Sequence, residues 1–135
     1  MATIKSYTNL EQSKKLVEIL PLESADMCYL PTHIGDEHHF IASLSPYSVC
    51  TKMTDVSIEY CTPCWSLVAL LCVLPKDEYK DVYLCFGGYQ GDKYISEWFC
   101  SYEQQEPFII EVCHADNPVD ACYKMIVKLN ELKML

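Results

Sequence analysis

Arginine is absent from this chain, and its absence limits what the protein can bind. All ten basic residues are lysines, and nineteen acidic residues bring the formal net charge to −9 over 135 residues. Nucleic-acid binding depends on basic side chains that neutralise phosphates, and the arginine fork suits phosphate best. A net-negative chain repels a phosphate backbone at long range. We therefore expect no nucleic-acid partner. An acidic surface suits solubility, a basic protein partner or mimicry of nucleic-acid charge.

Long hydrophobic runs are also missing. The longest candidate, Leu67–Leu74, has eight residues, whereas a membrane-spanning helix needs roughly 18. Met1–Ser6 contain no apolar signal-peptide core. We therefore expect no membrane partner and a cytoplasmic location.

The sequence has little glycine and offers no phosphate-binding loop. Only four glycines occur, and the adjacent pair Gly87 and Gly88 precedes a hairpin pattern rather than a helix. No nucleophile-elbow motif is present either. These absences favour a protein without catalytic activity and without a cofactor.

Cysteine, in contrast, is abundant. The chain has nine, which is an odd number, and no secretory signal accompanies them, so a disulfide framework is not expected. Most lie in apolar segments: Cys72 in Leu70–Leu74, Cys85 in Val82–Phe86, and Cys122 on a helical stripe. Buried free cysteine behaves as a small hydrophobe. We therefore expect structural thiols in the core and a reducing compartment.

Capping signals and apolar periodicity predict a helix near each end of the chain. The first opens at a capping box formed by Thr8 and Glu11 and runs to about Leu20. The last has Asn117 as its cap and covers about Pro118–Leu132, with an apolar stripe along one side.

A third helix is predicted in the middle of the chain. Thr62 is its expected cap, and Pro63 suits the first helical position. The continuation, Trp65–Leu74, is apolar almost all round. A helix of this kind is expected to be central and buried.

Strand patterns fill the intervals between these helices. The expected strands are Met27–Leu30, His38–Leu44, Asp55–Tyr60, Val82–Phe86, Lys93–Tyr102 and Phe108–Cys113. The resulting order is α-β-β-β-α-β-β-β-α, which lacks regular βαβ alternation. It predicts a single α+β domain over residues 1–135, with antiparallel sheets, the central helix and the amphipathic C-terminal helix. Residues 8–44 and 62–102 share a helix–Pro–strand–turn–strand pattern, which suggests a duplicated α-β-β unit.

The sharpest chemical motif is Cys61-Thr-Pro-Cys64. Placed after a strand and at the start of a helix, it resembles the active site of thioredoxin-like oxidoreductases, in which the helix N-terminus lowers a thiol pKa. The resemblance implies that Cys61 attacks, that Cys64 resolves, and that Pro107 is the cis-proline beside them. However, the βαβ unit of that family is missing, so redox function is the alternative hypothesis. We expect Pro107 to be trans and distant, and no Cys61–Cys64 disulfide.

A structural zinc site is a third hypothesis. Cys61 and Cys64 could supply two ligands, and His114 could complete the site. Other candidates for completing it are His38, His39 and Cys113. The chain lacks a second Cys-x-x-Cys motif, which weakens this interpretation.

One resemblance covers most of the chain. The segment Pro63–Pro75, the hairpin after it and the helix opening at Ala115–Ala121 are similar to a group of small proteins from gut bacteria and their mobile elements. The resemblance implies no activity, because none is established for the group. Ten tyrosines and two tryptophans are typical of protein interfaces. The leading hypothesis is therefore a non-enzymatic accessory or interaction protein of a mobile element, with a protein partner.

Overall fold

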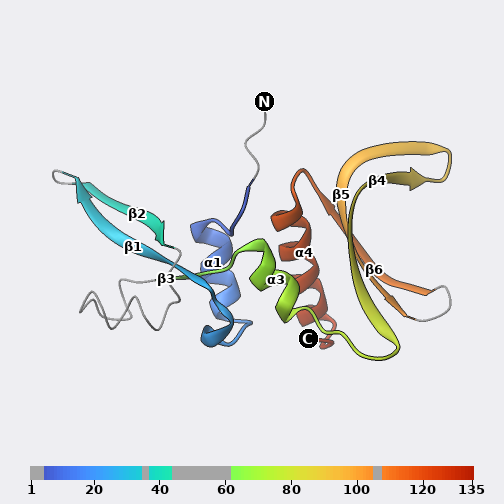
Figure 1. Ribbon diagram of the computed structural model, residues 1–135, viewed down its shortest axis with the longest axis horizontal. Coiled ribbons are helices and arrows are strands. Elements are labelled where there is room, and N and C mark those ends of the chain that lie inside the picture. Colours follow the sequence, from blue (N-terminus) through green and yellow to red (C-terminus); the bar gives the residue numbers. More distant parts are fainter. Residues whose placement is uncertain (1–4, 35–36, 44–61, 105–107) are drawn as a thin grey trace. The chain divides into compact units, whose positions relative to one another are not determined.

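The computed structural model describes residues 5–34, 37–43, 62–104 and 108–135. In these ranges it contains α1 (Leu10–Val17), a short 3-10 helix η1 (Leu22–Ser24), β1 (Met27–Ile34), β2 (Glu37–Ser43), β3 (Thr62–Cys64), α3 (Leu67–Val73), β4 (Lys80–Gln90), β5 (Lys93–Gln104), β6 (Phe108–Ala115) and α4 (Pro118–Glu131) (Figure 1). The predicted α-β-β-β-α-β-β-β-α order is confirmed. The predicted strand Asp55–Tyr60 lies outside the described residues.

Both sheets are antiparallel, which confirms the predicted α+β class. Their strand orders are β2-β1-β3 and β4-β5-β6. The chain divides into two compact units, here called the N-terminal unit (Tyr7–Ala69) and the C-terminal unit (Leu70–Leu135 with Met1–Ser6). The single domain and the duplication stay predictions.

In the N-terminal unit, the N-cap of α1 lies one residue after the predicted cap. Asn9 is the N-cap, and its Oδ1 accepts from the backbone N–H of Gln12 at 2.8 Å, while the Gln12 side chain accepts from the Asn9 N–H at 3.1 Å. The capping box predicted at Thr8 and Glu11 is therefore wrong. Thr8 is fully buried, and its hydroxyl forms a hydrogen bond with Ser13 Oγ at 2.8 Å. This side chain is therefore part of the core and does not cap the helix.

The predicted start of the middle helix is also wrong. Thr62, Pro63 and Cys64 form β3, in which Pro63 lies opposite Cys28 of β1. Proline donates no backbone hydrogen bond, and a strand at the edge of a sheet, as β3 is, accepts it. The helix α3 begins three residues after this strand ends. Its cap is Ser66, whose Oγ accepts from the Ala69 N–H at 3.2 Å.

The helix α3 is buried on one side rather than on all sides. Ala69 and Leu70 are buried, but Val68 is 68% exposed and Cys72 is exposed as well. An apolar sequence does not by itself show which faces are covered, because apolar atoms also make up much of an ordinary protein surface.

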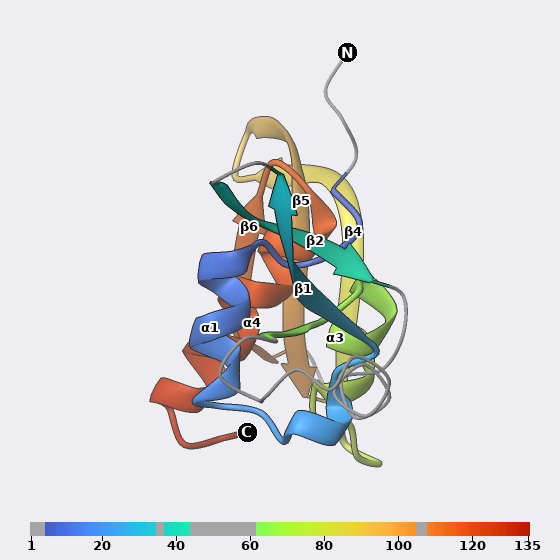
Figure 2. The same cartoon turned by 90° about the vertical axis from the view of Figure 1, so that its left-hand side faces the viewer.

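The C-terminal unit is built on α4, and here the prediction is confirmed. The Asn117 side chain accepts from the Asp120 N–H at 2.9 Å, and Pro118 takes the first helical turn. The helix lies along one face of β5 and β6 (Figures 1 and 2). The fully buried members of its stripe are Val119, Cys122, Met125, Ile126 and Leu129.

The strands β4 and β5 form a long hairpin with a bend near its outer end. Gly87 has φ of +75°, and the register shifts between Phe86 and Gly88. A Cβ atom at Gly87 would collide with the Tyr94 hydroxyl. Glycine is required here both by the backbone and by the ring that covers it.

Candidate functional site

The structure places only part of the Cys-x-x-Cys motif. Cys61 and Pro107 lie outside the described residues, whereas Cys64 is in β3 and fully buried. The Cys64 thiol donates to the Thr8 carbonyl oxygen at 3.4 Å and lies 3.6 Å from Thr8 Oγ1. Burial raises the pKa of the Cys64 thiol, although hydrogen bonds from neighbouring side chains oppose the shift. Cys64 is therefore a protonated, enclosed thiol at neutral pH.

The surroundings of Cys64 are those of a structural network. The Tyr29 hydroxyl donates to the Thr8 carbonyl oxygen at 2.7 Å, and the Trp65 N–H donates to Thr8 Oγ1 at 3.2 Å. Among the described residues, no buried side-chain nitrogen or oxygen lacks a hydrogen-bond partner. The network joins the start of α1 to β1 and β3. Because Cys64 is not at a helix N-terminus, the effect that would lower its pKa does not act on it.

The candidate zinc ligands are distributed over separate elements. His38 and His39 are in β2, where their backbone partners belong to β1, and Cys64 is in β3. His114 and Cys113 are in β6 of the C-terminal unit. Across the described part of the chain, no group of three or more His, Cys, Asp or Glu side chains is placed to hold a metal ion.

His114 takes part in a surface pair instead. Its Nδ1 lies 2.7 Å from Glu97 Oε2 on the neighbouring strand, and its ring centroid is 5.8 Å from that of Phe99. Both members of the ion pair are partly exposed. An exposed pair of this kind contributes little to stability and does not constitute a catalytic group alone.

The thiols are more varied than the sequence predicts. Those at positions 28, 64, 100 and 122 are buried, as expected for structural cysteines, and the thiols at positions 64, 72, 85, 100, 113 and 122 are free. The expectation that Cys72 and Cys85 are buried is wrong, because both are exposed. Cys85 lies opposite Phe99, and adjacent strand residues point to opposite faces, so it faces away from Cys100 and α4.

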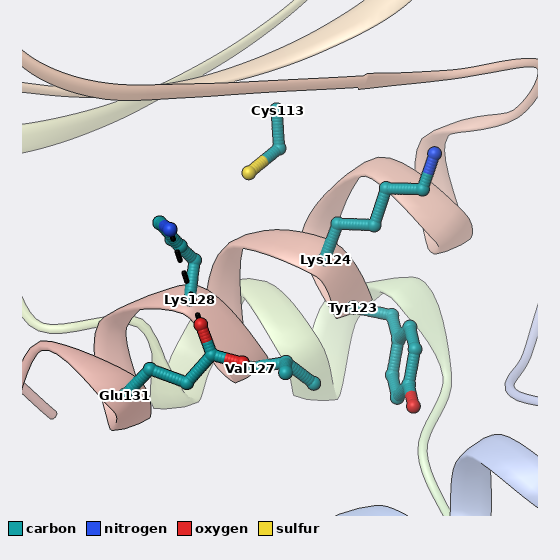
Figure 3. Close-up of a pocket in the computed structure, with 6 residues that line it drawn as sticks. All are labelled: Cys113, Tyr123, Lys124, Val127, Lys128 and Glu131. Carbon is teal, nitrogen blue, oxygen red and sulfur yellow. Dashed lines mark ion pairs between the residues drawn. The ribbon is translucent and has the colours of Figure 1, made fainter.

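An open groove of about 270 Å³ lies between β6 and α4 (Figure 3). Cys113 lines it from the strand, and α4 supplies Tyr123, Lys124, Val127, Lys128 and Glu131. In Figure 3 the Cys113 thiol points toward the helix.

The groove contains no ionised nucleophile. Burial, followed by Glu111 and Cys100, raises the pKa of Cys113 to about 11, while Lys124 and Lys128 oppose the shift. The Lys124 ammonium donates to the His114 carbonyl oxygen at 3.0 Å, and Lys128 lies 3.9 Å from Glu131. The thiol is therefore protonated near pH 7, and both lysines already have partners within the protein.

The most distinctive surface is a cluster of four rings at the outer end of the β4–β5 hairpin, here called the aromatic platform. It consists of Phe86, Tyr89, Tyr94 and Trp98. The centroids of Phe86 and Trp98 are 5.5 Å apart, and those of Tyr89 and Tyr94 are 5.2 Å apart, both with edge-to-face geometry. Tyr89 is 75% exposed, Phe86 56% and Tyr94 52%.

The sequence patterns do not locate this platform, although the surplus of tyrosine is visible in the composition. Aromatic residues in strands ordinarily pack on a sheet. Tyr83 and Tyr79 are also exposed, at 51% and 58%, but Tyr83 lies three residues before Phe86 on β4 and so faces the opposite side of the sheet. The available signal was the concentration of aromatic residues around Gly87–Gly91, where the hairpin bends and turns.

Comparisons with protein-family models, with curated proteins and with solved structures found no match to this chain. Within the described ranges, no helix combines the length and the apolar character that crossing a membrane requires. The function is therefore inferred from the surfaces of the molecule itself.

Proposed function

We propose that this protein is a non-enzymatic accessory protein that binds a protein partner through the aromatic platform. The observation that carries the proposal is the exposure of Phe86, Tyr89 and Tyr94, each more than half accessible to solvent. Clustered exposed aromatic rings are typical of interaction sites, and aromatic residues are enriched among the residues that contribute most to binding.

The platform is also ordered before any partner arrives. Each ring is paired edge-to-face with another, and Tyr94 packs over Gly87 where a side chain would not fit. Rings held in this way lose little conformational freedom on binding, so more of their contact energy contributes to affinity. This arrangement supports recognition of a folded partner or an extended segment rather than catalysis.

The setting we propose is the cytoplasm of a bacterial host, with the protein encoded by a mobile element. Free thiols at six described cysteines suit a reducing compartment. The proposed origin rests on the similarity of Pro63–Pro75 and Ala115–Ala121 to small proteins of gut bacteria and their mobile elements.

Site-specific photo-crosslinking in the native host tests this proposal. A photoreactive phenylalanine analogue replaces Tyr89 in one variant and Val68 in a control, since Val68 is also highly exposed but lies in α3. We expect a discrete protein adduct from position 89 and none of the same mass from position 68. Adding Tyr94→Ser should reduce the adduct. Equal crosslinking at both positions, or no adduct at position 89, would refute the proposal.

A further inference from the structure

The strands that carry the platform belong to an acidic stretch of the chain. Residues 77–116 carry nine carboxylates and two lysines, so this stretch holds seven of the nine net negative charges of the chain. The carboxylates are Asp77, Glu78, Asp81, Asp92, Glu97, Glu103, Glu106, Glu111 and Asp116. The same stretch contains β4, β5 and β6.

These carboxylates face water to a large extent. Asp77, Glu78, Asp81, Asp92 and Asp116 are exposed, and the other described members are half-buried. Three lysine–carboxylate pairs of the described chain, Lys5–Asp120, Lys15–Glu18 and Lys128–Glu131, involve carboxylates outside this stretch. The sheet of the C-terminal unit therefore presents negative charge that its own lysines do not balance.

Aromatic rings and carboxylates favour the same kind of ligand. The face of an aromatic ring carries partial negative charge and attracts an ammonium or guanidinium group within about 6 Å. Carboxylates attract the same groups over a longer range and speed their association. Phosphates and acidic segments are repelled by both.

We propose that the aromatic platform binds a lysine- or arginine-rich segment of a partner protein, whose cationic side chains lie over the exposed rings of Tyr89 and Tyr94 and near Asp92 in the adjoining turn. The inference rests on the proposed function, because it names the chemistry of the partner at the same surface. A protein segment is the occupant because the net-negative, arginine-free chain repels nucleic acid.

Synthetic peptides of about twelve residues test the charge preference on the full-length protein. One alternates arginine with glycine, the second lysine with glycine, the third glutamate with glycine, and the fourth serine with glycine. Binding is followed by the fluorescence of Trp98, since the other tryptophan, Trp65, is fully buried. We expect the basic peptides to bind at least about tenfold more tightly than the others. Their binding should weaken several-fold when the ionic strength is raised from about 0.1 M to about 1 M, because the screening length then falls from about 10 Å to about 3 Å.

Two sets of variants locate the site. Tyr89→Ser should weaken binding of the arginine peptide about two- to fivefold, whereas Val68→Ser should leave it unchanged. Asp92→Asn, in the turn next to the platform, should also weaken it. The control is Glu11→Gln, which removes the same net charge from an exposed position of the N-terminal unit and should have a smaller effect.

The outcomes separate this inference from the proposed function. If position 89 crosslinks a protein but the arginine and lysine peptides bind no better than the serine peptide, the interaction function stands and the basic partner is wrong. The basic partner is also wrong if the crosslinked segment contains no lysine or arginine. If both control sets weaken binding as much as the platform variants, attraction is general and the site is wrong. Failure of both crosslinking and peptide binding overturns both proposals.

Discussion

The two units of this protein use a similar sequence of elements but are held together by different interactions. Each contains a hairpin and a third strand, yet β3 pairs with the first strand of its hairpin, whereas β6 pairs with the second. In the C-terminal unit, six fully buried side chains of the fourteen-residue α4 contribute to the core. In the N-terminal unit, the three-residue β3 is attached by buried hydrogen bonds.

The hydrogen bonds of the N-terminal unit connect residues far apart in the chain. The Thr8 N–H donates to the Trp65 carbonyl oxygen at 3.0 Å, and the Trp65 N–H donates to Thr8 Oγ1 at 3.2 Å. Asp26 accepts from the Ser66 N–H at 2.9 Å. The Trp65 indole N–H donates to Ser24 Oγ at 2.9 Å. The two sheets are thus fixed in different ways: in the C-terminal unit by a helix with a continuous apolar stripe, and in the N-terminal unit by satisfied polar groups beside the apolar cluster of Met27, Tyr29 and Cys64.

The largest expected loss of stability comes from a cavity made in the core of the C-terminal unit. Met125→Ala removes a fully buried side chain from α4, and this should lower the free energy of unfolding by about 2–5 kcal/mol. Leu132→Ala is the control, since Leu132 follows the same helix but is 45% exposed; it should cost less than about 0.5 kcal/mol. Urea unfolding measures the change, and hydrogen exchange should show greater loss of protection in residues 70–135. Equal loss in residues 7–69 would contradict the distinction between the units.

A smaller effect is expected from the polar network of the N-terminal unit. Thr8→Val keeps the shape of the side chain but leaves the Trp65 N–H and the Ser13 hydroxyl without their partner. We expect a loss of about 1–3 kcal/mol, because buried polar groups without partners are costly. Thr8→Ser retains the hydroxyl and should recover most of the stability. If Thr8→Val is as stable as the wild type, hydrogen bonding does not hold β3 in place.

Alkaline pH should weaken the C-terminal unit through Cys113. The pKa of this thiol is raised to about 11 from an ordinary value of 9.0, so the folded state favours the neutral form. Its contribution is therefore complete below about pH 9 and is lost as pH rises through about 11. Cys113→Ser should reduce the loss of stability in this range, whereas Cys72→Ser, at an exposed position, should not. Midpoints of urea unfolding, measured between about pH 9 and pH 11, test this expectation. Identical pH profiles for the two variants would exclude Cys113 as the cause of the lost stability.

The smallest effect on folding is expected at the aromatic platform. Because Tyr89 is 75% exposed, Tyr89→Ser should change the free energy of unfolding by less than about 0.5 kcal/mol. A thermal melt that matches the wild type would show that the ring is available for binding. A loss comparable to that of Thr8→Val would instead make this ring part of the fold of the C-terminal unit.

The sequence alone determined the elements whose signals are local. The cap at Asn117, the proline after it and the stripe through Val119 and Ile126 are all within one helix, and the predicted helix matches α4. Alternating strand patterns and the glycine-rich turn predicted the antiparallel β4–β5 pairing for the same reason. These features depend on neighbours a few residues away, so periodicity and capping rules capture them.

Only the tertiary structure decided the roles of Thr8, Pro63, Cys64 and Cys85. Thr8 could cap a helix, but its hydroxyl instead accepts a hydrogen bond from the backbone N–H of Trp65, 57 residues later. Pro63 could open a helix, but it lies in β3, which pairs with the edge of β1. This pairing places Cys64 beside the Thr8 hydroxyl rather than at a helix N-terminus. Cys85 is exposed because strand register turns it away from α4. In each case the local sequence allowed more than one structure, and contacts distant along the chain selected one of them.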